Sequence, residues 1–292
     1  MPARILSIPF AVLALVFLYL TWEVDTGYSI YIVPCVIAMA LIYVLSPQIN
    51  WWWFQRRPPE LKPKIRMLIT RHLPYYQKLV ESEQGRFRKR VALYMEANDF
   101  RPQGMETVPE DLRAIAAACA VQITFGQKDF LLPKFENIIF YPHPFPSPQY
   151  PENFHSSEVY EEDGVVIFSA EQLLPGFLQP FQYYNIGLHE YAKVFVRSNP
   201  QIDFPKVGAD TWPALEQISG FRQAAIQKWI NLDPIPVQPV SIAHFFTFPQ
   251  RFQAVLPELY GQYERIFNQS PAREATPVLE DFHSGGGDGG IG

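Results

Sequence analysis

The chain has 292 residues, a net charge of −5, and 18% charged against 48% hydrophobic residues. Its 28 prolines exclude a long coiled coil, and its two cysteines exclude a disulfide scaffold or a multi-cysteine zinc module. Residues 56–90 carry eleven Lys or Arg against three acids, whereas residues 91–292 carry twelve against twenty-four. Because an acidic body repels phosphate backbones, we expect no nucleic-acid partner.

Two apolar segments open the chain. Ile5–Trp22 and Tyr28–Leu45 each hold 18 residues without a charge. A helix of that length rises about 27 Å, close to the thickness of the hydrocarbon core of a bilayer. A cleaved signal peptide is the rival interpretation, but only Arg4 precedes the first segment and no small-residue cleavage site follows it. The pattern therefore predicts a two-helix transmembrane hairpin over residues 1–57.

Aromatic and basic residues follow the second apolar segment. Trp51, Trp52 and Trp53 stand where an aromatic belt is expected, and Arg56 and Arg57 begin the basic block. The loop between the two segments holds acids and no Lys or Arg. The positive-inside rule then predicts a two-pass protein of a bacterial inner membrane with its body in the cytoplasm. The basic block also favours contact with anionic lipid headgroups, and a patch for a specific partner is the alternative.

The remaining chain predicts a mixed fold. Apolar spacing and Pro or Gly breaks indicate helices over 61–95, 110–125, 185–195, 211–230 and 252–267, and strands over 135–141 and 165–168. This order of helices, small sheet and helices is typical of an α+β domain, which we place at residues 58–271. Residues 272–292 are rich in glycine, which predicts a disordered tail.

One pair of residues could carry chemistry. His189 and Glu190 lie inside a predicted helix. In the zincin motif His-Glu-x-x-His, two imidazoles four positions apart share a helix face and hold zinc, and the Glu acts as a general base on the zinc-bound water. Here the fifth position is Lys193. The pair alone is a weak signal, because His-Glu is common by chance.

The surrounding sequence resembles the Mlc titration factor A family of glucose-regulated zinc metallopeptidases. That family has an Asn shortly before a His-Glu-x-Ala-His motif, and this chain has Asn185-Ile-Gly-Leu-His189-Glu190-Tyr-Ala192-Lys193. The likeness continues over most of residues 61–271, in the segments Phe135–Phe145, Val165–Ser169, Phe245-Phe246, Pro257–Tyr260 and Phe267–Pro271. The resemblance implies a zincin-like fold with a small sheet and flanking helices, and an ancestry among zinc-dependent peptidases.

The same comparison implies that the ligand set is degenerate. The family's second zinc-binding His falls on Lys193, and its third ligand, a Glu, falls on Pro236. Only His189 and the general base Glu190 remain, as vestiges. His244 is the one plausible substitute donor nearby. A catalytic zinc takes about three protein ligands, so we expect no bound cofactor.

Two functions of different classes follow from the sequence. In the first, Lys193 pairs with Glu190, and a catalytically inactive protein serves as scaffold, regulator or accessory subunit of a membrane complex, with the lipid bilayer and a membrane protein as partners. In the alternative, the chain is an active membrane-tethered zinc peptidase that uses His189, Glu190 and a substitute ligand such as His244. A third possibility is that the hairpin itself makes the important contacts with other membrane helices.

Overall fold

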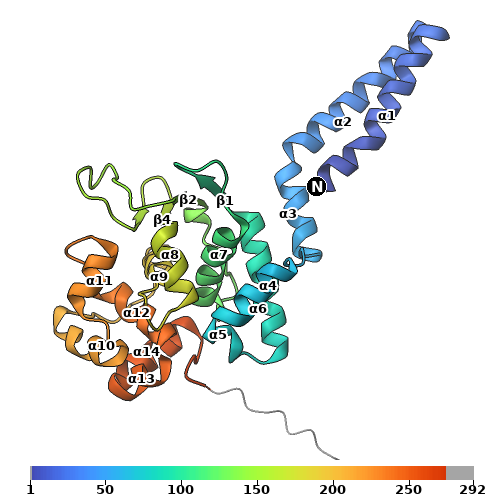
Figure 1. Ribbon diagram of the computed structural model, residues 1–292. Helices are drawn as coiled ribbons and strands as arrows, with labels where there is room; N and C mark the ends of the chain where they lie inside the picture. Colours follow the sequence, from blue (N-terminus) through green and yellow to red (C-terminus); the bar gives the residue numbers. More distant parts are fainter. Residues whose placement is uncertain (1, 274–292) are drawn as a thin grey trace, which may run out of the picture.

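The computed structural model describes residues 2–273, and the predicted Gly-rich tail lies almost wholly outside this range (Figure 1). The first two helices, α1 (Pro2–Glu23) and α2 (Ile32–Val44), pack side by side and project away from the body. A 3-10 helix at Thr26–Tyr31 connects them. Helix α3 (Ser46–Arg56) then leads to the body.

The hairpin has the length and composition of two membrane spans. The candidate spans are Pro2–Glu23 and Thr26–Val44, and almost none of their residues is buried. Asp25 begins the connecting turn, and its carboxylate accepts a hydrogen bond of 2.6 Å from the backbone N–H of Gly27. Leucine, isoleucine and valine side chains that face outward along this whole hairpin are expected where lipid replaces water.

The next predicted helix, 61–95, is wrong as a single element. The structure divides it into α4 (Pro63–His72), α5 (Pro74–Gln77) and α6 (Glu81–Ala97). The break at Leu73 follows from Pro74, which lacks an N–H and keeps the preceding residue extended. Gly85 lies inside α6 and does not interrupt it.

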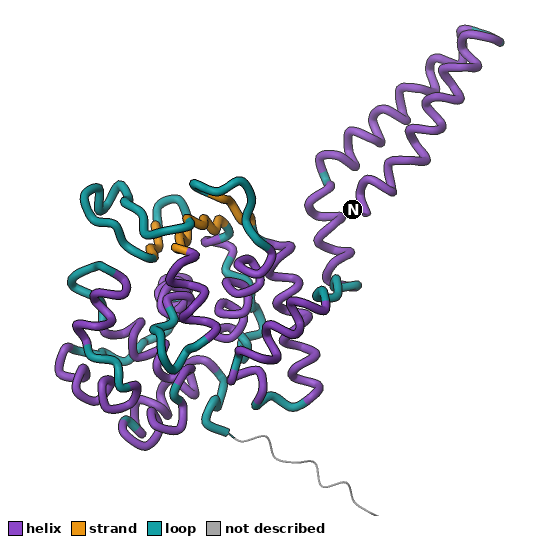
Figure 2. The backbone as a smooth tube through the Cα atoms, viewed as in Figure 1, coloured by secondary structure: helices purple, strands orange, loops and turns teal. Residues whose placement is uncertain are grey.

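A four-stranded sheet covers one side of the body (Figure 2). The predicted strands are β2 (Asn137–Tyr141) and β4 (Val165–Ser169), which pair in parallel. The sequence missed β1 (Asp99–Pro102), parallel to β2, and β3 (Ser157–Tyr160), antiparallel to β4. The strand order is β1-β2-β4-β3, so β3 is an edge strand. Both missed strands have only four residues, too few to show an alternating pattern.

Helices that pack behind the sheet form the core of the body. Helix α7 (Glu110–Thr124) matches its prediction and is buried on all sides from Ala114 onward. It packs against α6 and against α9 (Ile186–Ser198), and α8 (Ala170–Leu178) connects the sheet to α9. The small side chains of α7 allow these neighbours to approach closely. A Cβ added at Gly187 of α9 would lie 2.7 Å from Sγ of Cys119 on α7.

The C-terminal part corrects two further predictions. The helix predicted at 211–230 is two helices, α10 (Trp212–Ser219) and α11 (Gln223–Ile230), separated at Gly220, whose φ of 79° is left-handed. The helix predicted at 252–267 is α13 (Pro249–Val255) and α14 (Pro257–Phe267), which Pro257 separates. Helix α12 (Val237–Thr247), which carries His244, packs against α9. Together with the sheet, these helices make the body an α+β fold.

Candidate functional site

The His-Glu pair lies in the first half of α9. Asn185 caps this helix, and its side-chain oxygen accepts a hydrogen bond of 3.0 Å from the backbone N–H of Leu188. Residues 186–192 are all buried, because α9 is enclosed by α7, α8, α12 and β3. His189 and Glu190 are 2% and 0% exposed. The site is therefore part of the core of the domain and is closed to solvent.

Glu190 is held by two partners. Its Oε2 lies 2.7 Å from Nζ of Lys193, one helical turn further along α9, and its Oε1 accepts a hydrogen bond of 2.8 Å from the Ser157 hydroxyl on β3. Burial by itself raises the pKa of Glu190. The charge of Lys193 and both hydrogen bonds outweigh burial, so the pKa of Glu190 lies below its ordinary value. The sequence predicts this ion pair, and the structure places its carboxylate in the interior.

His189 turns toward a tyrosine. The hydroxyl of Tyr184 lies 2.7 Å from Nδ1 of His189. Burial lowers the pKa of His189 to about 4, because the protein interior solvates the charged imidazolium poorly. The imidazole is therefore neutral at pH 7.

His244 approaches the same tyrosine from α12. Its ring centroid lies 6.0 Å from that of Tyr184, and the centroid of His189 lies 5.7 Å from Tyr184 on the α9 side. Phe221 and Phe248 pack on His244 at 6.5 and 5.7 Å. Nε2 of His244 is buried without a hydrogen-bond partner among the described residues. Burial lowers its pKa to about 4, and the nearby His189 contributes to this shift.

The residues present do not fit the zinc ion that the resemblance implies. The described residues contain no group of three or more His, Cys, Asp or Glu side chains that could hold a metal. Glu190 is already bound by a lysine, and Nδ1 of His189 by a tyrosine hydroxyl. Pro236, on which the resemblance places the family's third ligand, caps α12, and its side chain carries no donor atom. Two imidazoles remain, fewer than the three protein ligands of a catalytic zinc.

Two members of this cluster escaped the sequence analysis. Tyr184 immediately precedes the capping Asn185, and Ser157 lies in a four-residue strand. Neither belongs to a spacing pattern that indicates a site. A second buried pair also appeared only in the structure: Nε2 of His155 lies 3.1 Å from Oε2 of Glu158 on the same edge strand.

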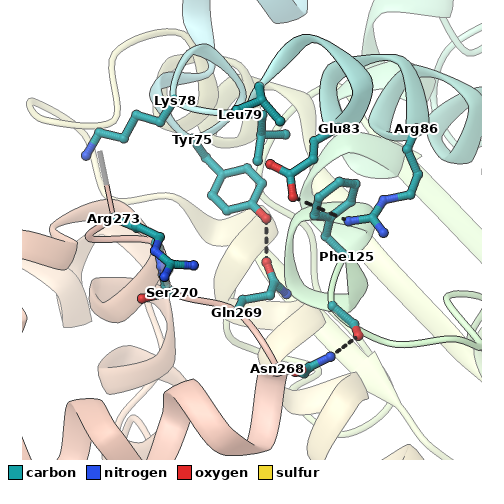
Figure 3. A pocket seen from close by; sticks show the side chains of 13 residues that line it. Tyr75, Lys78, Leu79, Glu83, Arg86, Phe125, Asn268, Gln269, Ser270 and Arg273 are labelled. Atoms are coloured by element: carbon teal, nitrogen blue, oxygen red, sulfur yellow. Dashed lines mark hydrogen bonds and ion pairs between the residues drawn. The ribbon is translucent and has the colours of Figure 1, made fainter. Parts of the chain in front are cut away.

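The open cavities lie elsewhere. Figure 3 shows the one beside α5, of about 390 Å³, where Tyr75 donates a hydrogen bond of 2.5 Å to Gln269. Arg86 and Arg273 also line it, and neither His189 nor His244 does. A second cavity, of about 400 Å³, separates α3 from the end of α6. The described body thus has open cavities, but these two do not reach the His-Glu pair.

The predicted interfacial residues lie on α3. Arg56 stacks on the ring of Trp52 at 3.9 Å, and Arg57 stacks on Trp53 at 4.9 Å. Trp52 and Trp53 are 51% and 39% exposed, whereas Trp51 faces the cavity between α3 and α6. Cationic and aromatic groups on one short helix after two apolar helices fit a position at a membrane surface.

Comparisons with known proteins now bear on the site. A search of curated proteins gives no match. The sequence model of a family described as glucose-regulated metallo-peptidase M90 matches residues 49–231, more than half of the chain. The match includes β1 to β4, α9 and the His189-Glu190 pair, and it ends before Pro236 and His244. The chain therefore belongs to the glucose-regulated metallopeptidase M90 family.

Proposed function

We propose that this chain is a membrane-anchored M90 protein that has lost peptidase activity and acts by binding, as scaffold, regulator or accessory subunit of a membrane complex. One observation carries the proposal. The ammonium of Lys193 lies 2.7 Å from the buried carboxylate of Glu190, the residue that acts as general base in a zincin. A carboxylate neutralised by a fixed cation neither takes a proton from water readily nor supplies charge for a metal.

Closure of the site supports the same function. Glu190 is 0% exposed, so a peptide bond has no path to its carboxylate. The neighbouring edge strand is also occupied. The carbonyl of Val159 accepts a hydrogen bond of 3.1 Å from Arg197, and the N–H of Ser156 donates one of 2.9 Å to the carbonyl of Ile230. An extended peptide that added to β3 would have to displace these contacts.

The rival function is a tethered zinc peptidase with an atypical ligand set. It is favoured by the unpartnered Nε2 of His244 and by the neutral state of both imidazoles, the form that binds metal. It lacks a third donor. Glu190 would have to leave Lys193 and Ser157 and turn toward the histidines, which would remove the base from the reaction.

The hairpin indicates where in the cell the protein acts. We place residues 1–57 in a bacterial inner membrane as a two-pass anchor and residues 58–271 in the cytoplasm, because Arg56 and Arg57 follow the second span. The partners are then the bilayer and a membrane protein. A domain that keeps its fold after losing its catalytic site can still be maintained by selection for binding.

The deciding experiment measures zinc in the purified full-length protein by mass spectrometry, together with the thermal shift on adding zinc. A ligand at 100 times its dissociation constant stabilises the folded state by about 2.7 kcal/mol, so a real site gives a clear shift. We expect less than a tenth of an equivalent of zinc, no shift and no cleavage of peptide libraries. One zinc per chain with cleavage that E190Q abolishes and E258Q preserves would establish the peptidase instead; Glu258 is an exposed carboxylate on α14.

A further inference from the structure

The cavity between α3 and the body lies where a lipid headgroup would be. Its α3 wall consists of Pro47, Asn50, Trp51 and Phe54, which share one helix face by their spacing. These residues follow the end of the second candidate span at Val44. At 1.5 Å per residue they cover at most about the first 15 Å beyond the span, and the headgroup layer is roughly 5–8 Å thick.

The opposite wall comes from the body and combines apolar and acidic groups. Leu131, Leu132 and Pro133 extend the apolar lining, and Glu96 and Glu136 add two carboxylates. Among the described residues, no Lys, Arg or His lines the cavity. Both carboxylates are exposed, and neither forms an ion pair with another described residue. The two carboxylates therefore favour a ligand that brings a cationic group to this wall.

The volume and rigidity of the cavity suit a partly enclosed small molecule. About 400 Å³ is within the range of ligand pockets. Helix α3 is tied to the start of α1, because the side-chain oxygen of Asn50, a lining residue, accepts a hydrogen bond of 3.0 Å from the backbone N–H of Ala3. The cations of α3, Arg56 and Arg57, stack on Trp52 and Trp53, which are not among the lining residues.

We propose that this cavity binds an aminophospholipid from the cytoplasmic leaflet, with its primary ammonium at Glu96 and Glu136 and its apolar part against Trp51, Phe54 and Leu132. An ammonium makes charge-assisted hydrogen bonds with carboxylates and is attracted to the face of an indole. The bound lipid would connect α3 to the body and so fix how the domain stands on the membrane. The inference goes beyond the binding role proposed above and rests on its membrane anchor.

The test uses the full chain in nanodiscs that contain phosphatidylethanolamine and phosphatidylglycerol in equal amounts with identical acyl chains. Lipid retained after transfer to detergent is counted by native mass spectrometry. We expect at least fivefold enrichment of phosphatidylethanolamine in the wild type, and a ratio near one in E96Q/E136Q. The control E152Q/E258Q removes two exposed carboxylates elsewhere and should keep the enrichment. A97W, which fills the cavity without changing charge, should lose the lipid.

A wild-type ratio near one, enrichment of phosphatidylglycerol, or an unchanged ratio in E96Q/E136Q would each overturn the lipid site. Resistance to carbonate extraction, measured on bacterial membranes that contain the full chain, separates the two proposals. A protein that carbonate extracts is not anchored, and both proposals then fall. An integral protein without lipid preference contradicts only the lipid site.

Discussion

The hydroxyl of Ser157 on β3 lies 2.8 Å from Oε1 of Glu190 on α9, while Lys193 holds the other oxygen of the same carboxylate at 2.7 Å. The edge strand β3 and helix α9 thus each supply one partner to the same buried carboxylate. In an active zincin the corresponding carboxylate must exchange protons with a metal-bound water. Here every strong contact of Glu190 is internal to the protein, so its charge stabilises the fold.

The first prediction concerns that ion pair. K193M leaves the carboxylate of Glu190 buried without its cation, and we expect a loss on the order of 3 kcal/mol in the free energy of unfolding, because an uncompensated buried charge is costly. K193M/E190Q removes both charges and should recover most of the loss. Urea denaturation of the full-length protein in detergent measures all three proteins. Equal stability of K193M and wild type would show that the pair contributes nothing.

The two buried histidines predict a dependence of stability on pH. The pKa of each is lowered to about 4 in the folded state, against 6.5 for an ordinary histidine. The unfolded chain therefore binds more protons below pH 6.5, and the stabilisation that is complete above pH 6.5 is lost as the pH falls toward 4.

Unfolding in the presence of a chelator should show this slope, and H244F should reduce it by about one proton. The phenyl ring suits the aromatic surroundings of His244, so the fold should survive at pH 7. An identical slope in H244F and wild type would contradict the assignment.

Restoring zinc ligands tests whether positions 193 and 236 correspond to the ligand positions of the family. K193H restores the second imidazole four residues after His189, and P236E restores a carboxylate at the start of α12. We expect K193H/P236E to bind zinc at least tenfold more tightly than K193H, measured by competition with a chromophoric chelator. K193H/P236Q is the matched control, because its amide is a poorer zinc ligand. No difference between the Glu and Gln versions would mean that position 236 does not face the site.

The packing of α7 against α9 gives a prediction about the core. A Cβ at Gly187 would meet Sγ of Cys119 at 2.7 Å. G187A should therefore cost about 1–3 kcal/mol of stability through overpacking. C119A removes the sulfur, so G187A should cost less in the C119A background than in the wild type. Additive losses in this double-mutant cycle, measured by thermal unfolding, would mean that another neighbour sets the size of residue 187.

Much of the fold could be predicted because its long elements have strong local signals. The apolar hairpin, α7, α9 and the strands β2 and β4 each have a hydrophobic run or a helical period. The breaks at Pro74, Gly220 and Pro257 were missed because apolar spacing continued across them, although a proline or glycine marked each position. A proline or glycine indicates a helix break more strongly than continued apolar spacing indicates one long helix.

The candidate site could be predicted only where it lies within one helix. His189, Glu190 and Lys193 are neighbours in sequence, so their contact follows from helix geometry. Tyr184 contacts both His189 and His244, and His244 follows it by 60 residues; Ser157 reaches Glu190 from a strand too short to recognise. Such contacts depend on how β3 and α12 pack on α9, which no local pattern determines.

The last prediction concerns the orientation of the hairpin. If residues 1–57 cross the membrane twice with Arg56 and Arg57 inside, the C-terminus lies in the cytoplasm. A fluorescent protein fused there should fluoresce, because it folds in the cytoplasm. An alkaline phosphatase fused there should be inactive, because it needs the periplasm. Placing basic residues between the spans, as V24K/T26K, adds positive charge to the external turn and should reduce membrane insertion in this orientation. The control V24S/T26S leaves that turn without added charge. An active phosphatase fusion in the wild type would place the body outside the cytoplasm and, with it, the aminophospholipid cavity on the opposite leaflet.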